Sequence, residues 1–363
     1  MNNPRVIDQS VISAAISDLD GIQQAVNDRG VLVPNGTPVA QYPDRIRAIG
    51  SHWLRPPDWI PIDVVDANSI TFTVADAGNA AISLAVTNSV AGTQYSVDWG
   101  DGTPVTTAAS AAAVQHTYVK GAGKPCSRGY TSFKAVIKPV GAAAITKLQF
   151  RFPNAPNPGG GPSLGILELN ANVDTLTNMD SMFNASTSPA FNCYMLENLI
   201  FSGSTAGVTS MTYAFNYCYR LARISGFNAS GVANMQQAFY SCVSLTELPA
   251  LNLASATNLT NTFVSCNSLA GMLDLSSGTK ITALNASNCY NLDRVIVSNQ
   301  APFTGSTPQI NLNYTGLSAD ALNALFDSLP AVTANQAVSV TGTPGAAACD
   351  KTRATAKGWS VTG

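Results

Sequence analysis

Residues 210–221 read SMTYAFNYCYRL, residues 234–245 read NMQQAFYSCVSL and residues 258–269 read NLTNTFVSCNSL. The three stretches start 24 residues apart and align without gaps, with Phe, Cys and Leu at the same places. A fixed period of this length predicts stacked structural repeats, because one such unit cannot bury its apolar side chains without a neighbour. We therefore expect a solenoid in the second half of the chain.

The cysteines extend this period beyond the three stretches. They are separated by 25, 24, 24 and 23 residues. Within a repeat the apolar residues lie at offsets 0, 4, 7 and 10, which predicts one stripe on a short helix, followed by a strand. The side chains expected to form this repeat ladder are Cys193, Cys218, Cys242, Cys266, Cys289, Phe215, Phe239 and Phe263.

A column of cysteines has three interpretations: a small dry core position, a disulfide framework or a metal cluster. Equivalent positions in adjacent parallel coils lie about 5 Å apart, but their Cβ atoms do not point at one another as a disulfide requires. The sequence also lacks the C-x-x-C pairs that are typical of zinc sites. We favour the first interpretation, with each thiol acting as a small hydrophobe, and we expect no metal and no cofactor.

The registers at 234–245 and 258–269 resemble the leucine-rich repeats of the BspA-like type, which occur in bacterial surface and phage proteins. The resemblance covers roughly residues 165–363 and implies a leucine-rich-repeat solenoid with a C-terminal cap. The sequence departs from the family's repeat pattern in the first and the last unit. The first unit carries an insertion after Phe183, and the last has Ala286 where Phe is expected, as capping repeats require.

The length of 363 residues predicts two or three domains, and charged residues make up only 11% of the chain. Residues 120–151 hold 7 basic side chains and no acidic one. This segment could dock on an acidic partner or form a solvated sheet face, and we favour the sheet face. No secretory leader opens the sequence and no apolar run reaches the roughly 18 residues of a membrane span. We therefore expect assembly in a cytoplasm, with free thiols and no membrane insertion.

Composition and spacing divide the chain into modules that make it mostly β with short helices. The Trp/Pro-rich connector holds Trp53 and Trp59, which could be sugar-stacking platforms or clamps on a neighbouring domain, and we favour clamps. The expected modules are a helical attachment or oligomerisation segment (1–50), the connector (51–67), a β-sandwich (68–152), a linker (153–164) and the capped solenoid (165–363).

Apolar residues at helical spacing between Ile12 and Val26 predict an N-terminal helix. Together with GVLVPNGTPVAQY (30–42) and DRIRAIG (44–50), this segment resembles the N-terminal segments of tailed-phage tail and fibre proteins. The resemblance implies a part that mounts the protein on a virion. Packing of the helix on its own chain stays an alternative.

Alternating apolar runs after the connector predict the β-sandwich. The motif VDWGDGT at 97–103, followed by HTY at 116–118, resembles the signature of PKD domains, which are immunoglobulin-like modules of surface proteins. The resemblance implies a spacer or adhesion module, with His116 in a structural position. Asp98 and Asp101 could hold calcium, but tight-turn chemistry explains them more simply.

The sequence offers little for catalysis. His52 and His116 lie outside the repeats, and no nucleophile elbow, phosphate loop or H-E-x-x-H motif is present. A glycoside hydrolase would need two facing carboxylates, which stacking could bring together, but no two share a clear column of the repeat. We therefore expect no catalytic residues and no enzyme activity.

Tyrosines cluster near the repeat cysteines. A tyrosine provides a large contact area with a polar tip at low entropic cost, which suits carbohydrate or protein surfaces. The alternative is that these rings only cover the edge of the core, and the sequence does not decide between the two. The candidate surface-binding residues are Tyr194, Tyr213, Tyr217, Tyr219, Tyr240 and Tyr290.

These modules together predict a bacteriophage virion protein, a non-enzymatic tail fibre or adhesin. Residues 1–60 would attach it to other tail or baseplate proteins, and the repeat face would bind a host-surface glycan or protein. We expect a homo-oligomer, with a trimer as the state suited to a fibre, no nucleic-acid partner, and a location on a phage tail made in the host cytoplasm. The alternatives are a structural virion protein (fibre joint, collar or decoration protein), a cellular BspA-like adhesin and a glycan depolymerase.

Overall fold

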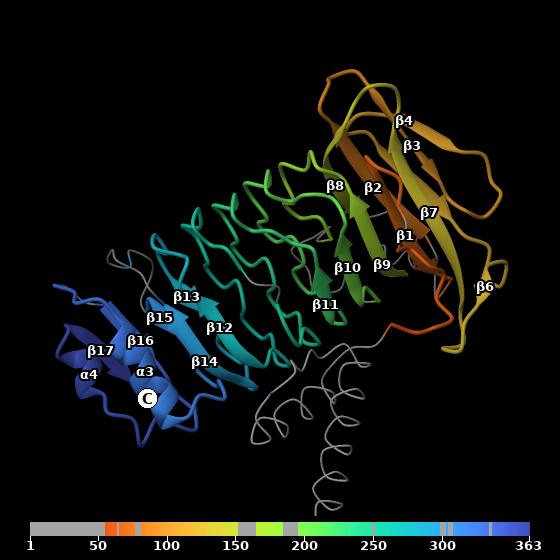
Figure 1. Ribbon diagram of the computed structural model, residues 1–363. Coiled ribbons are helices and arrows are strands. Elements are labelled where there is room, and N and C mark those ends of the chain that lie inside the picture. Colours follow the sequence, from red (N-terminus) through yellow and green to blue (C-terminus); the bar gives the residue numbers. More distant parts are fainter. Residues whose placement is uncertain are drawn as a thin grey trace, which may run out of the picture. The chain divides into compact units, whose positions relative to one another are not determined.

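The computed structural model shows a mostly β protein with few helices (Figure 1). It describes residues 55–63, 65–76, 81–151, 165–183, 195–248, 251–297, 303, 308–333 and 336–363. Pro57–Gly363 forms one compact unit. Four predicted features lie outside the described residues: the segment 1–50, Trp53, the linker 153–164 and the ladder position Cys193. No helix in the described part of the chain has the length and apolar character that a bilayer-crossing segment needs.

Two antiparallel sheets face each other in the N-terminal part of this unit. Phe72 of one sheet meets Phe150 of the other edge to face, with ring centroids 5.3 Å apart, and the inward side chains of both sheets share one core. The first sheet contains β1 (Ser69–Ala75), β3 (Gln94–Asp98), β4 (Thr106–Ala109), β6 (Lys124–Pro125) and β7 (Thr131–Pro139), and the second contains β2 (Ala81–Asn88), β5 (Ala113–Thr117) and β8 (Ile145–Arg151). Membership of this part in the PKD family stays a prediction.

Both sheets continue into the repeats through backbone hydrogen bonds. On one side β9 (Ile166–Asn172) pairs antiparallel with β1 and parallel with β10 (Asn198–Phe201). On the other side Phe150 of β8 donates its N–H to the carbonyl of Met182, in the first repeat, at 2.8 Å. The two-sheet part therefore covers the N-terminal end of the stack, where an uncovered coil would leave an open strand edge.

The connector crosses the outer face of this junction. Its carbonyl groups at Ile62 and Val65 each accept a hydrogen bond from an asparagine side chain of β9, both at 2.8 Å. Trp59, which is only 1% exposed, donates its ring N–H to the Tyr130 hydroxyl at 3.1 Å. An exposed sugar-stacking role is therefore excluded for Trp59, which holds the connector against the sheet.

The predicted solenoid is confirmed, with coils joined by parallel strand pairs. Figure 1 shows the coils following one another from β9 toward the C-terminal helices. Besides β9 and β10, its strands are β11 (Arg223–Ser225), β12 (Gly271–Leu275), β13 (Leu284–Asn285), β14 (Leu292–Val297), β15 (Ile310–Asn311), β16 (Gln336–Ser339) and β17 (Trp359–Thr362).

The expectation of a short helix along each apolar stripe is wrong. Alternate residues from Met211 to Tyr217 donate their N–H groups to carbonyls of the next repeat, between Asn234 and Tyr240, and not along a helix. Two residues in each stretch have positive φ, as at Tyr213 (57°) and Tyr217 (58°). These left-handed residues turn the chain about every fourth position, so a series of turns places the side chains inward at a spacing that imitates a helix.

An asparagine column fixes one corner of the coil. Asn234 and Asn258 accept a hydrogen bond from the backbone N–H two residues later, at 3.1 and 3.0 Å. The equivalent position in the preceding repeat is Ser210, whose hydroxyl donates to Asp180 and does not accept from the backbone. There Asp180, from the repeat before, accepts hydrogen bonds from the Thr212 N–H at 2.8 Å and the Ser210 hydroxyl at 2.5 Å.

The Asp180 carboxylate is ionised in this role. Partial burial works to raise its pKa, but hydrogen bonds from Ser210, Asn178 and Thr212 together hold the pKa below its usual value. A carboxylate with a lowered pKa stabilises the fold above its unfolded-state pKa of about 3.9, and this contribution is lost as the pH falls through the lowered value.

We expect Asp180→Ala to lower the free energy of unfolding by about 1–2 kcal/mol at neutral pH, because the Thr212 N–H loses its acceptor. Adding Ser210→Asn should recover at least half of that loss, since asparagine supplies the acceptor in the sister repeats. Urea unfolding of the single and double variants measures both effects, with Ser210→Asn alone as the control. The difference between wild type and Asp180→Ala should shrink below about pH 4. A double variant no more stable than Asp180→Ala would contradict this role.

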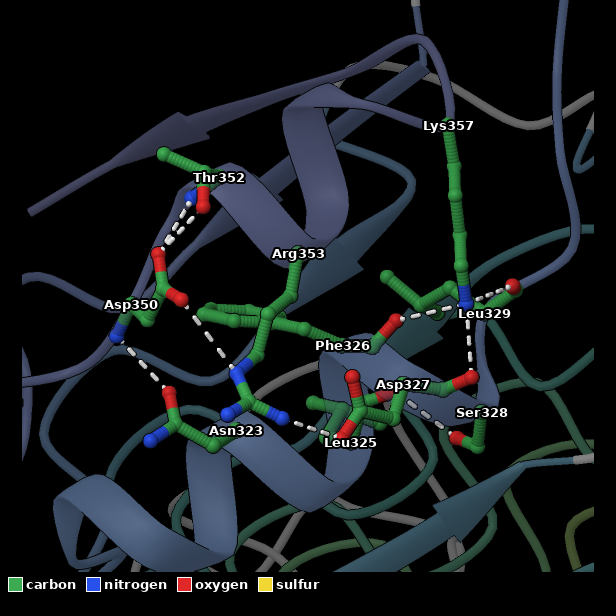
Figure 2. Close-up of polar contacts among 10 residues, drawn as sticks. All are labelled: Asn323, Leu325, Phe326, Asp327, Ser328, Leu329, Asp350, Thr352, Arg353 and Lys357. Carbon is green, nitrogen blue, oxygen red and sulfur yellow. Dashed lines mark hydrogen bonds and ion pairs between the residues drawn. The ribbon is translucent and has the colours of Figure 1, made fainter.

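The C-terminal end of the stack is closed by α3 (Ala319–Ser328) and α4 (Thr352–Thr355), which are joined by polar contacts (Figure 2). Lys357 Nζ donates to three carbonyl groups at the end of α3, those of Phe326, Asp327 and Leu329, at 3.1, 2.6 and 3.0 Å. Arg353 pairs with the Asp327 carboxylate at 2.6 Å. A cation at this position supplies a donor to the carbonyl groups of the last helical turn, of which that of Phe326 also accepts from the Leu329 N–H.

Candidate surface-binding site

The repeat ladder forms the rigid support of the site. Successive phenylalanine rings lie 5.4 Å apart between Phe215 and Phe239 and 5.9 Å apart between Phe239 and Phe263, and all three are fully buried. The cysteines do more than fill space, because their thiols donate hydrogen bonds across coils. Cys242 donates to the Phe215 carbonyl at 3.2 Å and Cys266 to the Phe239 carbonyl at 3.1 Å.

The described ladder thiols are protected from solvent. Burial raises the pKa of Cys242 and of Cys266 far above the usual thiol value, so the reactive thiolate is absent at neutral pH. The six cysteines that the structure describes are all free, and the two outside the ladder, Cys126 and Cys349, are partly exposed.

In the folded protein we expect iodoacetamide to modify Cys126 and Cys349 and to spare Cys218, Cys242, Cys266 and Cys289. Peptide mass spectrometry after a timed reaction gives the answer for each residue. The same reaction in guanidinium chloride is the control and should label all six. Ladder cysteines that react as fast as Cys126 in the folded state would show that the stack opens.

Three of the predicted tyrosines form one cluster on the repeat surface, the tyrosine cluster. The rings of Tyr217 and Tyr240, from adjacent coils, meet edge to face with centroids 5.3 Å apart. The rings of Tyr217 and Tyr219 lie 5.8 Å apart. All three side chains are half-buried, so the rings are held in place while part of each surface stays accessible. Burial, together with the neighbouring Tyr240, raises the pKa of Tyr217, so its hydroxyl stays neutral at physiological pH.

The coil requires left-handed residues at two positions of each stretch, but it does not require tyrosine there. Tyr213 and Tyr217 both have left-handed φ angles, a conformation that is uncommon for bulky residues. In the next repeat the same two positions hold Gln237 and Ser241, also with positive φ. Smaller or more flexible polar residues therefore satisfy the coil, and the tyrosines are not needed for the fold at these places.

The other predicted tyrosines are not gathered with the cluster. Tyr290 is 54% exposed and occupies the position of Tyr219 several coils further along the stack. Tyr213 is half-buried in the same coil as Tyr217, and no ring contact joins it to the cluster in the described part of the chain. Tyr194 lies outside the described residues. The structure thus brings three of the six candidates together.

Two ion pairs around the buried carboxylate of Glu197 were not predicted from the sequence. Arg220, the residue after Tyr219, pairs through Nη2 with Glu197 Oε1 at 3.2 Å. Arg128, from the loop between β6 and β7, pairs with the same oxygen at 2.5 Å, and its guanidinium lies 5.3 Å from the ring centre of Trp59. The partners are 69 residues apart in sequence, so no local pattern signals this link between the two-sheet part and the first coils.

The carboxylates of the PKD-like motif are occupied by turn contacts. Asp98 accepts a hydrogen bond from the Gly100 N–H at 2.9 Å, and Asp101 accepts from the Thr103 N–H at 3.1 Å. Asp101 also contacts His116 Nε2 at 2.7 Å, and the His116 ring stacks on a buried tryptophan. Gly100 has a φ of 71°, and a Cβ there would lie 1.9 Å from a backbone oxygen of β7. Among the described residues, no group of three His, Cys, Asp or Glu side chains could hold a metal ion.

Comparison with known proteins agrees with the solenoid. Residues 169–276, which run from β9 to the end of β12, match a family described as "Mycoplasma protein of unknown function, DUF285". This match and the observed coils are consistent with the predicted BspA-like repeats. No curated protein and no solved structure matches the chain.

Proposed function

We propose that the protein is a non-enzymatic adhesin that binds a cell surface through the tyrosine cluster on its repeat face. The observation that carries the proposal is the left-handed Tyr217, whose ring contacts Tyr219 and Tyr240, at a position where the next two repeats have Ser241 and Ser265. Backbone strain of this kind is concentrated at functional sites in proteins. The rings also sit on a stack that holds them without further ordering, which lowers the entropic cost of binding.

Our proposal for the biological setting is a tailed-phage virion. The resemblance of residues 1–50 to phage tail and fibre proteins supports attachment of residues 1–60 to other tail or baseplate proteins. A fibre would present several copies of the repeat face, so weak contacts with a host glycan or protein would be multiplied by avidity. A homo-oligomer, such as a trimer, suits this arrangement. The alternative within a virion is a purely structural protein, whose repeat face would contact another virion component and not the host.

A cellular adhesin is the second candidate. The matched family is described from Mycoplasma, which is a cellular organism, and this favours a bacterial surface protein with the same binding face. Immunogold labelling distinguishes the two settings. Gold on phage particles supports the virion, and gold on the envelope of uninfected cells that carry the gene supports the cellular adhesin.

The binding proposal is tested by exchanging the cluster for the residues of the sister repeats. The variant Tyr217→Ser, Tyr219→Val, Tyr240→Val carries the side chains found at Ser241, Val243 and Val264. We expect it to keep or raise the thermal midpoint of unfolding, because a strained tyrosine is replaced, and to lose at least about tenfold in apparent affinity. The measurement is binding of the fluorescently labelled full-length protein to a panel of intact bacterial cells.

The matched control is Tyr290→Asn, which carries the residue found at Asn267 and alters an exposed tyrosine away from the cluster. It should bind like the wild type. If the triple variant bound cells as strongly as the wild type, the cluster would not be the binding site. If the wild type bound no cells and co-purified with virion proteins, the structural virion role would be favoured.

A further inference from the structure

A second candidate site lies on the two-sheet part, away from the repeat face. The outer surface of the first sheet contains a depression of about 380 Å³, within the size range of small-molecule sites. Its lining comes from the connector (Val65, Asp66), from β1 (Ser69, Thr71), from β3 (Ser96, Asp98), from β7 (Lys134, Val136, Lys138) and from Val105 in the loop before β4. None of these lining residues belongs to the tyrosine cluster.

The walls of the depression are fixed by hydrogen bonds. The Val65 carbonyl accepts from the Asn172 side chain at 2.8 Å, and the Asp66 carbonyl accepts from the Ser69 hydroxyl at 2.6 Å. Lys138 pairs with the Asp66 carboxylate at 2.6 Å across one rim. The connector wall is therefore formed before any ligand arrives, which reduces the ordering cost of binding.

Three polar groups that line the depression can still form a hydrogen bond or an ion pair with a ligand. The Thr71 residue is 2% exposed, yet its hydroxyl has no hydrogen-bond partner among the described residues. Lys134 has no carboxylate within ion-pair distance in the described part of the chain, unlike Lys138, although it is near enough to Asp66 to help lower the pKa of that carboxyl. Asp98 uses one carboxylate oxygen, Oδ1, for the Gly100 N–H at 2.9 Å, and no described group donates to the other.

This set specifies the chemistry of a ligand. The Lys134 ammonium is a partner for one carboxylate, and the free oxygen of Asp98 can only accept and so requires a hydroxyl donor. Thr71 can exchange hydrogen bonds with a further hydroxyl, and Ser96, whose own hydroxyl donates to the Lys138 carbonyl at 3.3 Å, can accept one. Val105, 55% exposed, offers apolar surface to a sugar ring. A dianionic phosphate fits less well, because Lys138 is already paired with Asp66 and Lys134 alone cannot balance two negative charges.

From this geometry we infer that the depression binds a saccharide carrying a carboxylate, of the hexuronic acid class. The carboxylate pairs with Lys134, the ring hydroxyls hydrogen-bond to Asp98, Thr71 and Ser96, and one sugar ring fills the space between the connector and Val105. The protein would then have two separate binding surfaces, of which this one recognises acidic sugars.

The test is a titration of the full-length protein with D-glucuronate, D-glucose and glycine, followed by ligand-observed NMR at low ionic strength. We expect glucuronate to bind at least about tenfold more tightly than glucose or glycine, since only glucuronate combines the carboxylate with ring hydroxyls. Lys134→Gln should weaken glucuronate binding about tenfold, and Thr71→Val should weaken it severalfold while keeping the side-chain shape.

The control is Lys124→Gln, which removes a positive charge from the same sheet outside the depression and should bind glucuronate like the wild type. Circular dichroism and thermal unfolding verify that each variant is folded. Equal affinity for glucose and glucuronate, tighter binding of glycine, or unchanged binding in folded Lys134→Gln would each overturn the inference. Loss of cell binding in the tyrosine variant with unchanged glucuronate binding would show that the two sites act separately.

Discussion

The structure depends on the hydrogen bonds of β9, which pairs antiparallel with β1 on one edge and parallel with β10 on the other. A solenoid must protect its first strand, because an open edge pairs readily with another chain. Here a two-sheet module supplies that protection and continues the hydrophobic core. The ring contacts run from Phe72 through Phe150 and Phe183 into the phenylalanines of the repeats. The two parts therefore share one core.

Polar contacts across the junction reinforce this union. The Glu197 side chain is only 5% exposed and is paired with arginines from both parts, Arg128 and Arg220. A buried carboxylate is stable only when it is paired, so each part supplies the charge that the other requires. The connector adds Trp59 from the outside.

Comparing equivalent positions of successive coils separates residues that the fold requires from residues that it does not require. Stacking requires an inward side chain and a left-handed residue at fixed positions, and sister coils meet the second requirement with small or flexible polar residues such as Ser241 and Gln237. Tyr217 differs from the residues of the next three coils at its position, Ser241, Ser265 and Asn288, and tyrosine returns there at Tyr314. Departures that the stack does not require are where binding residues are expected. The sequence could nominate the tyrosines of the cluster, but only the contact across coils shows that Tyr217, Tyr219 and Tyr240 form one group.

The sequence by itself determined the period, the columns of phenylalanine and cysteine, and the two-sheet region, because side-chain burial imposes a repeat on the chain that can be read locally. It did not determine the backbone of the coil. An inward residue every three or four positions arises equally from a helix and from turns with left-handed residues, and only hydrogen bonding between coils selects the turns. The Asp180 contact with Ser210, the junction at β9 and the depression beside Lys134 likewise depend on residues far apart in sequence. Tertiary structure decided them because their energies come from partners that no local pattern specifies.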